Sequence, residues 1–237
     1  VTVDGVIEGS SNNYLISLTG DEKKLGLAML DLTTGEFKVD QGEMSKIIEK
    51  IKVLNPAEII CPESWTEERK KELAFLNENV TLTHLEMWKF DYDFAEKILT
   101  EHLKVTSLSG FGCQDLKLGI SAAGAILAYL KQTKKTFLSH INKISPSIEG
   151  EQMFLDTNTI RNLELLTAMG TGEKTFTLFY LLNKTKTAMG ARLLKSWIIR
   201  PLLNVDKIKE RQDAIEELLK NHDISLSLEK KINKISD

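Results

Sequence analysis

Short apolar runs and alternating stretches mark the first part of the chain as rich in strands. Residues 14–18 and 25–32 are short and largely apolar, and residues 36–40 alternate between polar and apolar side chains. Such patterns are typical of strands that are buried on one or both faces. The short polar connections at 19–24 and 33–35 therefore predict an antiparallel meander of three strands.

Helical and strand patterns alternate after the meander. Residues 44–54 place apolar side chains on one helical face, and Pro56 should end that helix. Further helices are expected at 66–77 and 91–103, and further strands at 58–61 and 80–85. Residues 120–131 then form an apolar run rich in alanine, which suits a tightly packed helix. This order predicts an α/β domain whose sheet has mixed strand directions.

A different pattern occupies residues 155–202, where three helix-forming segments follow one another closely. The first segment can be capped near Asp156, because short polar side chains accept hydrogen bonds from free backbone N–H groups. Its apolar face consists of Ile160, Leu163 and Leu166. The second segment contains the run 176–182, which is too apolar for a helix that faces solvent. We expect these helices to pack on one another and on the chain before them.

The third segment begins near Thr187 and should end at Arg200, because Pro201 disfavours helical geometry at the residue before it. Its apolar face consists of Met189, Leu193 and Trp197. Gly190 costs about 1 kcal/mol of helix propensity relative to alanine. A tolerated defect would explain this glycine, but we favour the close approach of another helix.

Ordered motifs in this helical region match those of a known protein family. They read Leu155-Asp156, Arg161-Asn162-Leu163-Glu164-Leu165, Thr187 through Leu194, Trp197, Pro201-Leu202 and IKERQDAIEELL at 208–219. The set resembles the start of the core domain of MutS-type DNA mismatch-repair proteins. That family typically reads Leu-Asp, Arg-Asn-Leu-Glu-Leu, Thr-x-Met-Gly-x-Arg-Leu-Leu, Trp and Pro-Leu.

The first half of the chain carries the same resemblance. Its motifs are SNNYL, LDLTTGEF, a strand before Pro-Glu-Ser, GFG, AAGAILAYLK and His140-Ile141. Their order is similar to that of the MutS connector domain, which has an RNase H-like fold. The N-terminus departs from the family, which usually has a Thr-Pro-Gly-Thr turn where this chain has Thr2-Val3-Asp4-Gly5.

These observations predict an α/β plus all-α chain. We expect a lead-in at 1–9, an RNase H-like mixed-sheet connector domain at 10–140, and a truncated helical core, or lever, domain at 141–237. The chain starts at Val1 and ends inside a helical pattern, so we interpret it as a piece of a longer protein. The C-terminal helices are then expected to be mobile or held by another copy through Ile208, Ile215, Leu219, Leu228, Ile232 and Ile235.

Composition narrows the class of protein. Hydrophobic residues at 42% and charged residues at 27% are typical of a soluble globular protein. The formal net charge of -3 gives no overall attraction to nucleic acid. No apolar run approaches the roughly 20 residues that span a bilayer, and no signal peptide pattern is present. Cys61 and Cys113 fit buried, reduced thiols of a cytoplasmic protein, and neither has a histidine nearby in the sequence.

Histidine and tryptophan residues give no sign of a site. The four histidines are far apart in the sequence and none has a partner at metal-ligand spacing, so no metal site is expected. They are His84, His102, His140 and His222. We expect Trp65, Trp88 and Trp197 to be packing residues rather than a platform for stacking bases.

The run at 170–175 resembles a phosphate-binding loop only in part. It ends in Lys174-Thr175, but Glu173 stands where the P-loop needs a glycine, and the other required glycine position is Ala168. A negative side chain there would repel phosphate. We therefore predict an ordinary loop between helices.

A nuclease site of the RNase H type needs several carboxylates that converge on divalent metal ions. Asp31 ends a buried strand and Glu36 follows the next turn, whereas Asp91 and Asp93 come much later. Only Asp31 is where a catalytic carboxylate would be expected, and an aspartate at the end of a strand is more often a turn residue.

A basic segment follows residue 181. Residues 181–211 include eight basic residues and only two acidic ones. Such a segment could bind DNA phosphates or an acidic partner, and the solvated faces of helices explain it equally well. The candidate residues are Lys184, Lys186, Arg192, Lys195 and Arg200.

The resemblance implies the function that we expect. A complete MutS protein would bind mismatched DNA as a homodimer, use ATP and Mg in a C-terminal ATPase domain, switch to a clamp and recruit MutL. This chain would supply the connector and lever region and would have no cofactor and no catalysis of its own. The alternatives are an RNase H-like metal-dependent nuclease with a helical appendage and a protein-binding scaffold.

Overall fold

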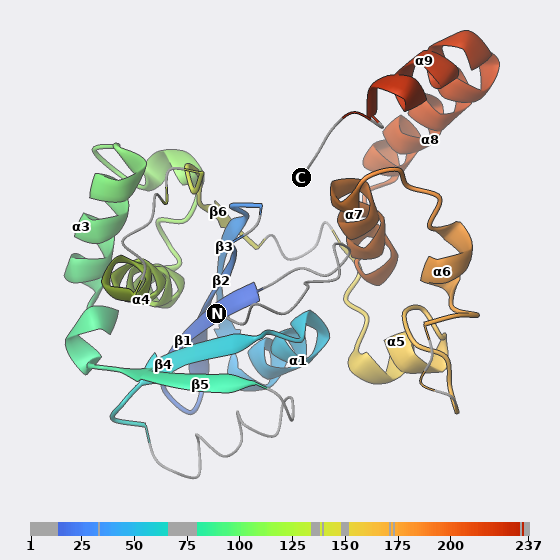
Figure 1. Cartoon of the computed structure of the whole chain (residues 1–237). Helices are drawn as coiled ribbons and strands as arrows, with labels where there is room; N and C mark the ends of the chain where they lie inside the picture. Colours follow the sequence, from blue (N-terminus) through green and yellow to red (C-terminus); the bar gives the residue numbers. More distant parts are fainter. Residues whose placement is uncertain are drawn as a thin grey trace. The chain divides into compact units, whose positions relative to one another are not determined.

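The structure, a computed structural model, describes residues 14–32, 34–65, 80–133, 138, 140–147, 152–170, 172, 174–232 and 234. The chain divides into two compact units. The described residues up to Ser147 form the sheet unit, and those from Gln152 onward form the helical unit (Figure 1). The lead-in expected at 1–9 and the helix expected at 66–77 lie outside the described residues.

The sheet unit is built on one mixed sheet. Its strands are β1 (Tyr14–Gly20), β2 (Lys24–Asp31), β3 (Phe37–Glu43), β4 (Glu58–Pro62), β5 (Thr81–Leu85) and β6 (Ser145–Pro146), in the order β5-β4-β1-β2-β3-β6. β1, β2 and β3 pair antiparallel, which confirms the predicted meander. β4 runs parallel to β1, β5 parallel to β4 and β6 parallel to β3, so the mixed strand directions are confirmed as well.

Helices cover both faces of this sheet. They are α1 (Met44–Leu54), η1 (Met87–Phe90), α3 (Tyr92–Leu103), η2 (Ser109–Phe111) and α4 (Lys117–Thr133). Neighbouring residues of a strand point to opposite faces, so Leu15 and Ile16 of β1 belong to different clusters. Leu15 lies in the cluster with α3 and α4, and Ile16 in the cluster with α1.

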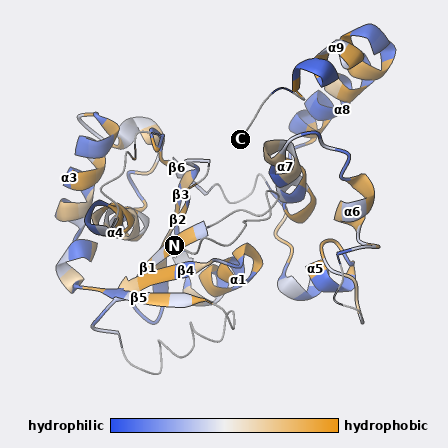
Figure 2. Cartoon of the chain, in the orientation of Figure 1, coloured by the Kyte–Doolittle hydropathy of each residue, from blue (hydrophilic) through white to orange (hydrophobic). Residues whose placement is uncertain are grey.

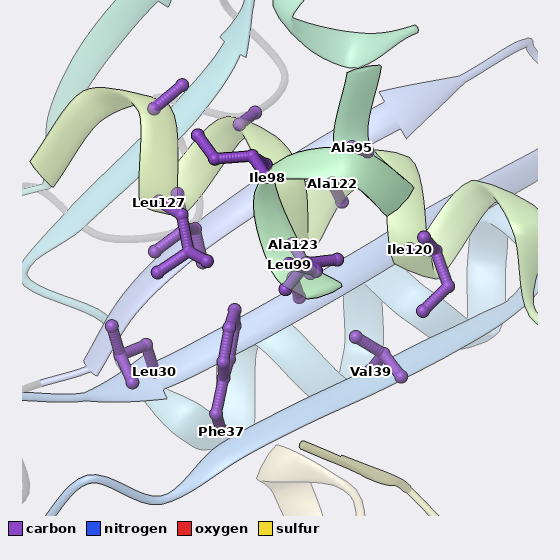
Figure 3. Close-up of a cluster of buried hydrophobic side chains, with 14 of the residues drawn as sticks. Leu30, Phe37, Val39, Ala95, Ile98, Leu99, Ile120, Ala122, Ala123 and Leu127 are labelled. Carbon is purple, nitrogen blue, oxygen red and sulfur yellow. The ribbon is translucent and has the colours of Figure 1, made fainter. Parts of the chain in front are cut away.

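The cluster beneath α3 and α4 forms the larger core (Figure 3). Leu30, Phe37 and Val39 of the sheet face side chains of the two helices. α3 rests on α4 at Gly124, where an added Cβ would come within 2.3 Å of the Cβ of Ala95. The small residues of α4 therefore permit close helix packing, as the sequence predicted.

The sheet unit continues beyond the boundary that we expected after residue 140. Ile141 and Ile144 are buried, and β6 pairs with β3 through Lys38 and Ser145. The Nε2 atom of His102 lies 2.9 Å from the carbonyl oxygen of Ile141 and binds this segment to α3. A two-residue strand gives no periodicity in the sequence, so the extension could not be seen there.

In the residues that the structure describes, the helical unit contains five helices. They are α5 (Thr157–Asn162), α6 (Leu178–Leu182), α7 (Ala188–Ile199), α8 (Val205–Lys220) and α9 (His222–Ile232). Asp156 caps α5 by accepting a hydrogen bond from the backbone N–H of Thr159, and Thr187 caps α7 through the N–H of Gly190. α7 ends at Ile199 with Arg200 as its C-cap, as the proline at 201 predicted. Of the helices in the described residues, none is long and apolar enough to cross a membrane.

Two packing predictions for the helical unit are wrong. α5 ends at Asn162 and Glu164 has a positive φ of 49°, so Leu163 is exposed and Leu165 is buried instead. The apolar run at 176–182 forms only a short helix, and Phe176 before it is 84% exposed. Both segments are too short to bury a continuous apolar face.

The favoured explanation of Gly190 is also wrong. An added Cβ would lie 3.1 Å from the Thr187 Oγ1 atom and 3.3 Å from the Thr185 Cβ, and its three nearest neighbours belong to these two threonines. The glycine therefore accommodates the connection before α7 and its capping threonine, rather than another helix.

The last two helices leave much of their apolar surface open. Ile215 and Leu219 of α8 and Ile224 of α9 are exposed. Hydrophilic and hydrophobic residues alternate along both helices (Figure 2). The expectation that these helices are mobile or held by another copy stays a prediction.

Candidate functional surfaces

The predicted basic surface begins in the connection before α7. Lys184 and Lys186 are exposed there, and the Lys186 ammonium lies 2.9 Å from a carboxylate oxygen of Glu229 in α9. Lys195 of α7 and Arg200 at its C-cap are half-buried. Lys186 thus already has an acidic partner within the unit.

Arg192 does not lie on an open surface. Its exposed fraction is 9%, and with Ala191 it forms the buried part of α7. The Arg211 guanidinium of α8 lies 3.8 Å from the centre of the Trp197 ring, a cation–π contact that holds α7 against α8. Part of the basic segment therefore stabilises the unit, and binding by Lys184, Lys186, Lys195 and Arg200 stays a prediction.

Three of the residues considered for a nuclease have structural roles. The backbone of the fully buried Asp31 closes the β2–β3 hairpin, because its N–H donates to the Glu36 carbonyl at 2.9 Å. The Glu36 carboxylate accepts a hydrogen bond from Tyr14 and pairs with Lys38. Asp91 caps α3 by accepting from the N–H groups of Asp93 and Phe94. In the ranges that the structure describes, no three His, Cys, Asp or Glu side chains are grouped so as to hold a metal ion.

The described residues of the stretch at 170–175 lie in the connection between α5 and α6; they are Gly170, Gly172, Lys174 and Thr175. Gly170 and Gly172 have positive φ values of 89° and 69°, and the Gly172 N–H donates to the Ala168 carbonyl. α6 begins only at Leu178. A P-loop instead leads directly into its helix, so that the backbone N–H groups of loop and helix surround phosphate.

A thiol–histidine contact escaped sequence reasoning. The Cys61 Sγ lies 3.2 Å from the Nδ1 atom of His84, because the two residues are direct partners in the parallel pair β4 and β5. They are distant in sequence, and only the register between the two strands brings them together. The other thiol, Cys113, has its pKa raised to about 11 by burial.

A buried carboxylate is a second feature that the sequence did not reveal. Glu58 at the start of β4 accepts hydrogen bonds from the Tyr129 hydroxyl at 2.7 Å and the Thr83 hydroxyl at 2.5 Å. Burial, followed by the hydrogen bond to Glu58, raises the pKa of Tyr129 to about 12. These contacts join β4, β5 and α4 and stabilise the fold.

The short helix η1 places an aromatic side chain on the surface. Met87 is 56% exposed and Trp88 is 54% exposed, so the expectation that Trp88 is a packing residue holds for only part of its ring. That ring meets Phe94 edge-on, with centroids 4.9 Å apart and planes at 78°. The next residue, Lys89, is buried.

Comparison with known families decides where this chain belongs. Residues 13–142 match the family model described as MutS domain II, and residues 158–237 match the one described as MutS domain III. The chain belongs to the MutS family. The first match lies in the sheet unit and the second in the helical unit, so the resemblance seen in the sequence motifs is confirmed.

Curated relatives support the same family. The DNA mismatch repair protein MutS of Cytophaga hutchinsonii is 38% identical over 237 residues, which cover 99% of this chain and 27% of that protein. The MutS proteins of Lachnoclostridium phytofermentans and Salinibacter ruber are 38% and 36% identical, over 91% and 99% of this chain and 23% and 26% of their own lengths. The chain thus spans about a quarter of the length of these relatives.

Solved structures also show a partial likeness to this chain. The fowlpox virus resolvase in complex with Holliday junction DNA is 11% identical, with a TM-score of 0.38. The match covers 52% of this chain and 99% of the resolvase chain. This score is too low to assign a fold. The α/β class and the mixed sheet are established, and the RNase H-like assignment of the sheet unit stays a prediction.

Proposed function

We propose that this chain is the connector and lever region of a MutS-type mismatch-repair protein. In this role the sheet unit transmits the state of the mismatch-binding part to the ATP-binding part and takes part in recruiting MutL. The helical unit begins the lever. The observation that carries the proposal is the consecutive match to MutS domains II and III, each within its own compact unit.

The chemistry of the described side chains supports a transmitting role without catalysis. The carboxylates of Glu36, Glu58 and Asp91 are engaged in an ion pair, buried hydrogen bonds and a helix cap. A rigid, well-packed sheet whose polar side chains bond within the unit can transmit displacement. Hydrolysis of ATP, with its Mg, would take place in another part of the protein.

Recruitment of MutL gives the direct test. The purified chain is immobilised and incubated with MutL from the organism that encodes it, with full-length MutS of the same organism as the positive control. We expect MutL to bind the chain more weakly than full-length MutS, because the chain supplies part of the surface. Absence of binding under conditions where full-length MutS binds would contradict the recruitment role.

Catalytic activity is tested separately. We expect the chain to leave ATP intact, and to leave DNA and RNA intact in the presence of Mg²⁺ or Mn²⁺. An ATPase rate that disappears in Lys174→Ala would contradict the proposal. Cleavage that disappears in Asp31→Asn would instead support an RNase H-like nuclease.

A further inference from the structure

Met87 and Trp88 stand apart from the other large apolar side chains of the sheet unit. Among the residues of this unit that the structure describes, they are the only large hydrophobic side chains with more than about a third of their surface exposed. The neighbouring Leu85 and Phe90 are buried. η1 thus turns two adjacent apolar side chains outward from an otherwise closed core.

The turn that carries these two side chains is held from beneath. Lys89 is 2% exposed, and its ammonium donates to the side-chain oxygen of Gln132 in α4 at 2.9 Å. The same ammonium lies 2.6 Å from a carboxylate oxygen of Glu86 and 5.5 Å from the centre of the Trp88 ring. Together with the edge-on contact to Phe94, these contacts fix the Trp88 ring before any partner arrives. A preformed aromatic surface loses little side-chain entropy on binding.

Exposed carboxylates flank the exposed pair along the chain. Asp91 and Asp93 follow η1, and the backbone of Glu63 bonds to Leu85 just before it. Glu86 is exposed as well but pairs with the buried Lys89, and the next exposed cation along α3 is Lys97. The Ser64 hydroxyl lies 3.5 Å from the Met87 sulfur, which places the end of β4 beside η1. Carboxylates repel the phosphates of nucleic acids and of anionic lipids, and they attract cationic side chains. The occupant that fits is therefore a basic segment of a protein.

We propose that Met87 and Trp88, with their acidic rim, form a docking surface for a basic segment of a partner protein that also carries an apolar side chain. An arginine or lysine of the partner would lie over the open part of the Trp88 ring and face Asp93 or Glu63. The apolar side chain would cover Met87. Tryptophan is enriched among the few residues that dominate binding energy at protein interfaces. The inference rests on the proposed function, because the partner is the protein that the sheet unit recruits.

The test uses the full chain and MutL from the same organism, with the dissociation constant measured by biolayer interferometry. We expect Trp88→Ala to weaken binding about tenfold or more and Met87→Ser to weaken it less. Met87→Ser also serves as a second surface variant should Trp88→Ala disturb the packing of Phe94. Thermal melting of each variant confirms that it is folded.

A matched pair of charge reversals tests the chemistry of the partner. Asp93→Lys lies beside η1, whereas Glu101→Lys lies eight residues further along α3, about 12 Å away. We expect Asp93→Lys to weaken binding severalfold, with the difference shrinking at high salt, and Glu101→Lys to leave it unchanged. Equal effects of the two reversals would overturn the assignment of a basic partner.

The outcomes separate this inference from the proposed function. Wild-type affinity in folded Trp88→Ala and Met87→Ser would overturn the docking surface and leave recruitment intact. Failure of the wild-type chain to bind MutL, where full-length MutS binds, would overturn both. Sedimentation of the chain alone tests whether a second copy of the chain occupies this surface. Self-association that Trp88→Ala abolishes would show that it does and would overturn the inference.

Discussion

In the sheet unit the large apolar side chains lie between the sheet and its helices, whereas in the helical unit most of them are exposed. Leu165 and Ala191 are the only buried hydrophobic residues of the helical unit in the part of the chain that the structure describes. The sheet unit instead has two clusters, one under α3 and α4 and one under α1. The sheet unit therefore supplies both the sheet and the helices that enclose its core.

The difference shows that amphipathic sequence alone does not make a core. α7 and α8 have apolar faces, but within the unit these faces meet few others, and the contact between Arg211 and Trp197 is one of the few that join the two helices. Burial of apolar surface stabilises a fold by about 25 cal/mol per Å². We therefore expect the helical unit to open at a lower free energy than the sheet unit.

Removing a buried side chain should give the largest contrast between the units. Leu99→Ala in α3 leaves a cavity in the main core and should lower the free energy of unfolding of the sheet unit by about 2–5 kcal/mol. The matched change Leu219→Ala in α8, where the side chain is 78% exposed, should alter stability by no more than about 0.5 kcal/mol. Urea unfolding of both variants measures the contrast. A large loss in Leu219→Ala would show that α8 is buried in solution.

A close helix contact gives the next largest effect. Alanine normally stabilises a helix relative to glycine, but in Gly124→Ala the new Cβ would collide with Ala95, so we expect a loss of about 1–3 kcal/mol. Gly110→Ala is the control, because an added Cβ there meets no atom within 4 Å. Thermal melting compares the two. A higher melting temperature in Gly124→Ala would contradict the packing of α3 on α4.

The buried Glu58 network should contribute a smaller, pH-dependent amount. Tyr129→Phe removes the hydrogen bond to Glu58 and should cost about 1 kcal/mol near neutral pH. The pKa of Tyr129 is raised to about 12 from an ordinary value of 10, so the Tyr129 hydroxyl stays protonated to a higher pH in the folded state than in the unfolded state. The contribution of the protonated Tyr129 hydroxyl to the free energy of unfolding is fully present below pH 10 and is lost as pH rises to 12.

Urea unfolding between pH 9 and 12 tests that sign. Wild-type protein should lose more stability between pH 10 and 12 than Tyr129→Phe does, with the exposed Tyr180→Phe as the control that follows the wild type. Parallel pH profiles for wild type and Tyr129→Phe would contradict the role of the hydroxyl.

The last effect is confined to one helix end in the helical unit. Asn204 accepts hydrogen bonds from the N–H groups of Asp206 and Lys207, so Asn204→Ala should destabilise the start of α8 by about 1 kcal/mol. Gln212→Ala, in the exposed middle of α8, is the control. Amide exchange at the first turn of α8 should quicken only in the first variant, since the helical unit opens locally. Equal exchange in both variants would argue against the cap.

Most elements of the sheet unit could be predicted from the sequence because their signals are local. The helix expected at 44–54 matches α1, with Pro56 shortly after its end. The three strands of the meander follow from short apolar runs joined by turns. These patterns show which side chains of a short segment should be buried. The side chains are buried as expected because the sheet and the helices that cover it belong to the same unit.

Features that depend on distant partners could not be predicted. The contact between Cys61 and His84 follows from the register between β4 and β5, and the exposure of Trp88 follows from the buried anchor Lys89. Arg192 looked like any basic surface residue, yet α7 turns it inward. The family motifs identified the MutS relationship because they preserve order along the chain, which requires no knowledge of contacts.

Hydrogen exchange of the whole chain, followed by mass spectrometry, tests the contrast between the units most directly. We expect β1, β2 and α4 to exchange slowly and together, and α6, α8 and α9 to exchange much faster. Protection of α8 and α9 equal to that of α4, in a chain shown to be monomeric, would contradict the contrast between the units.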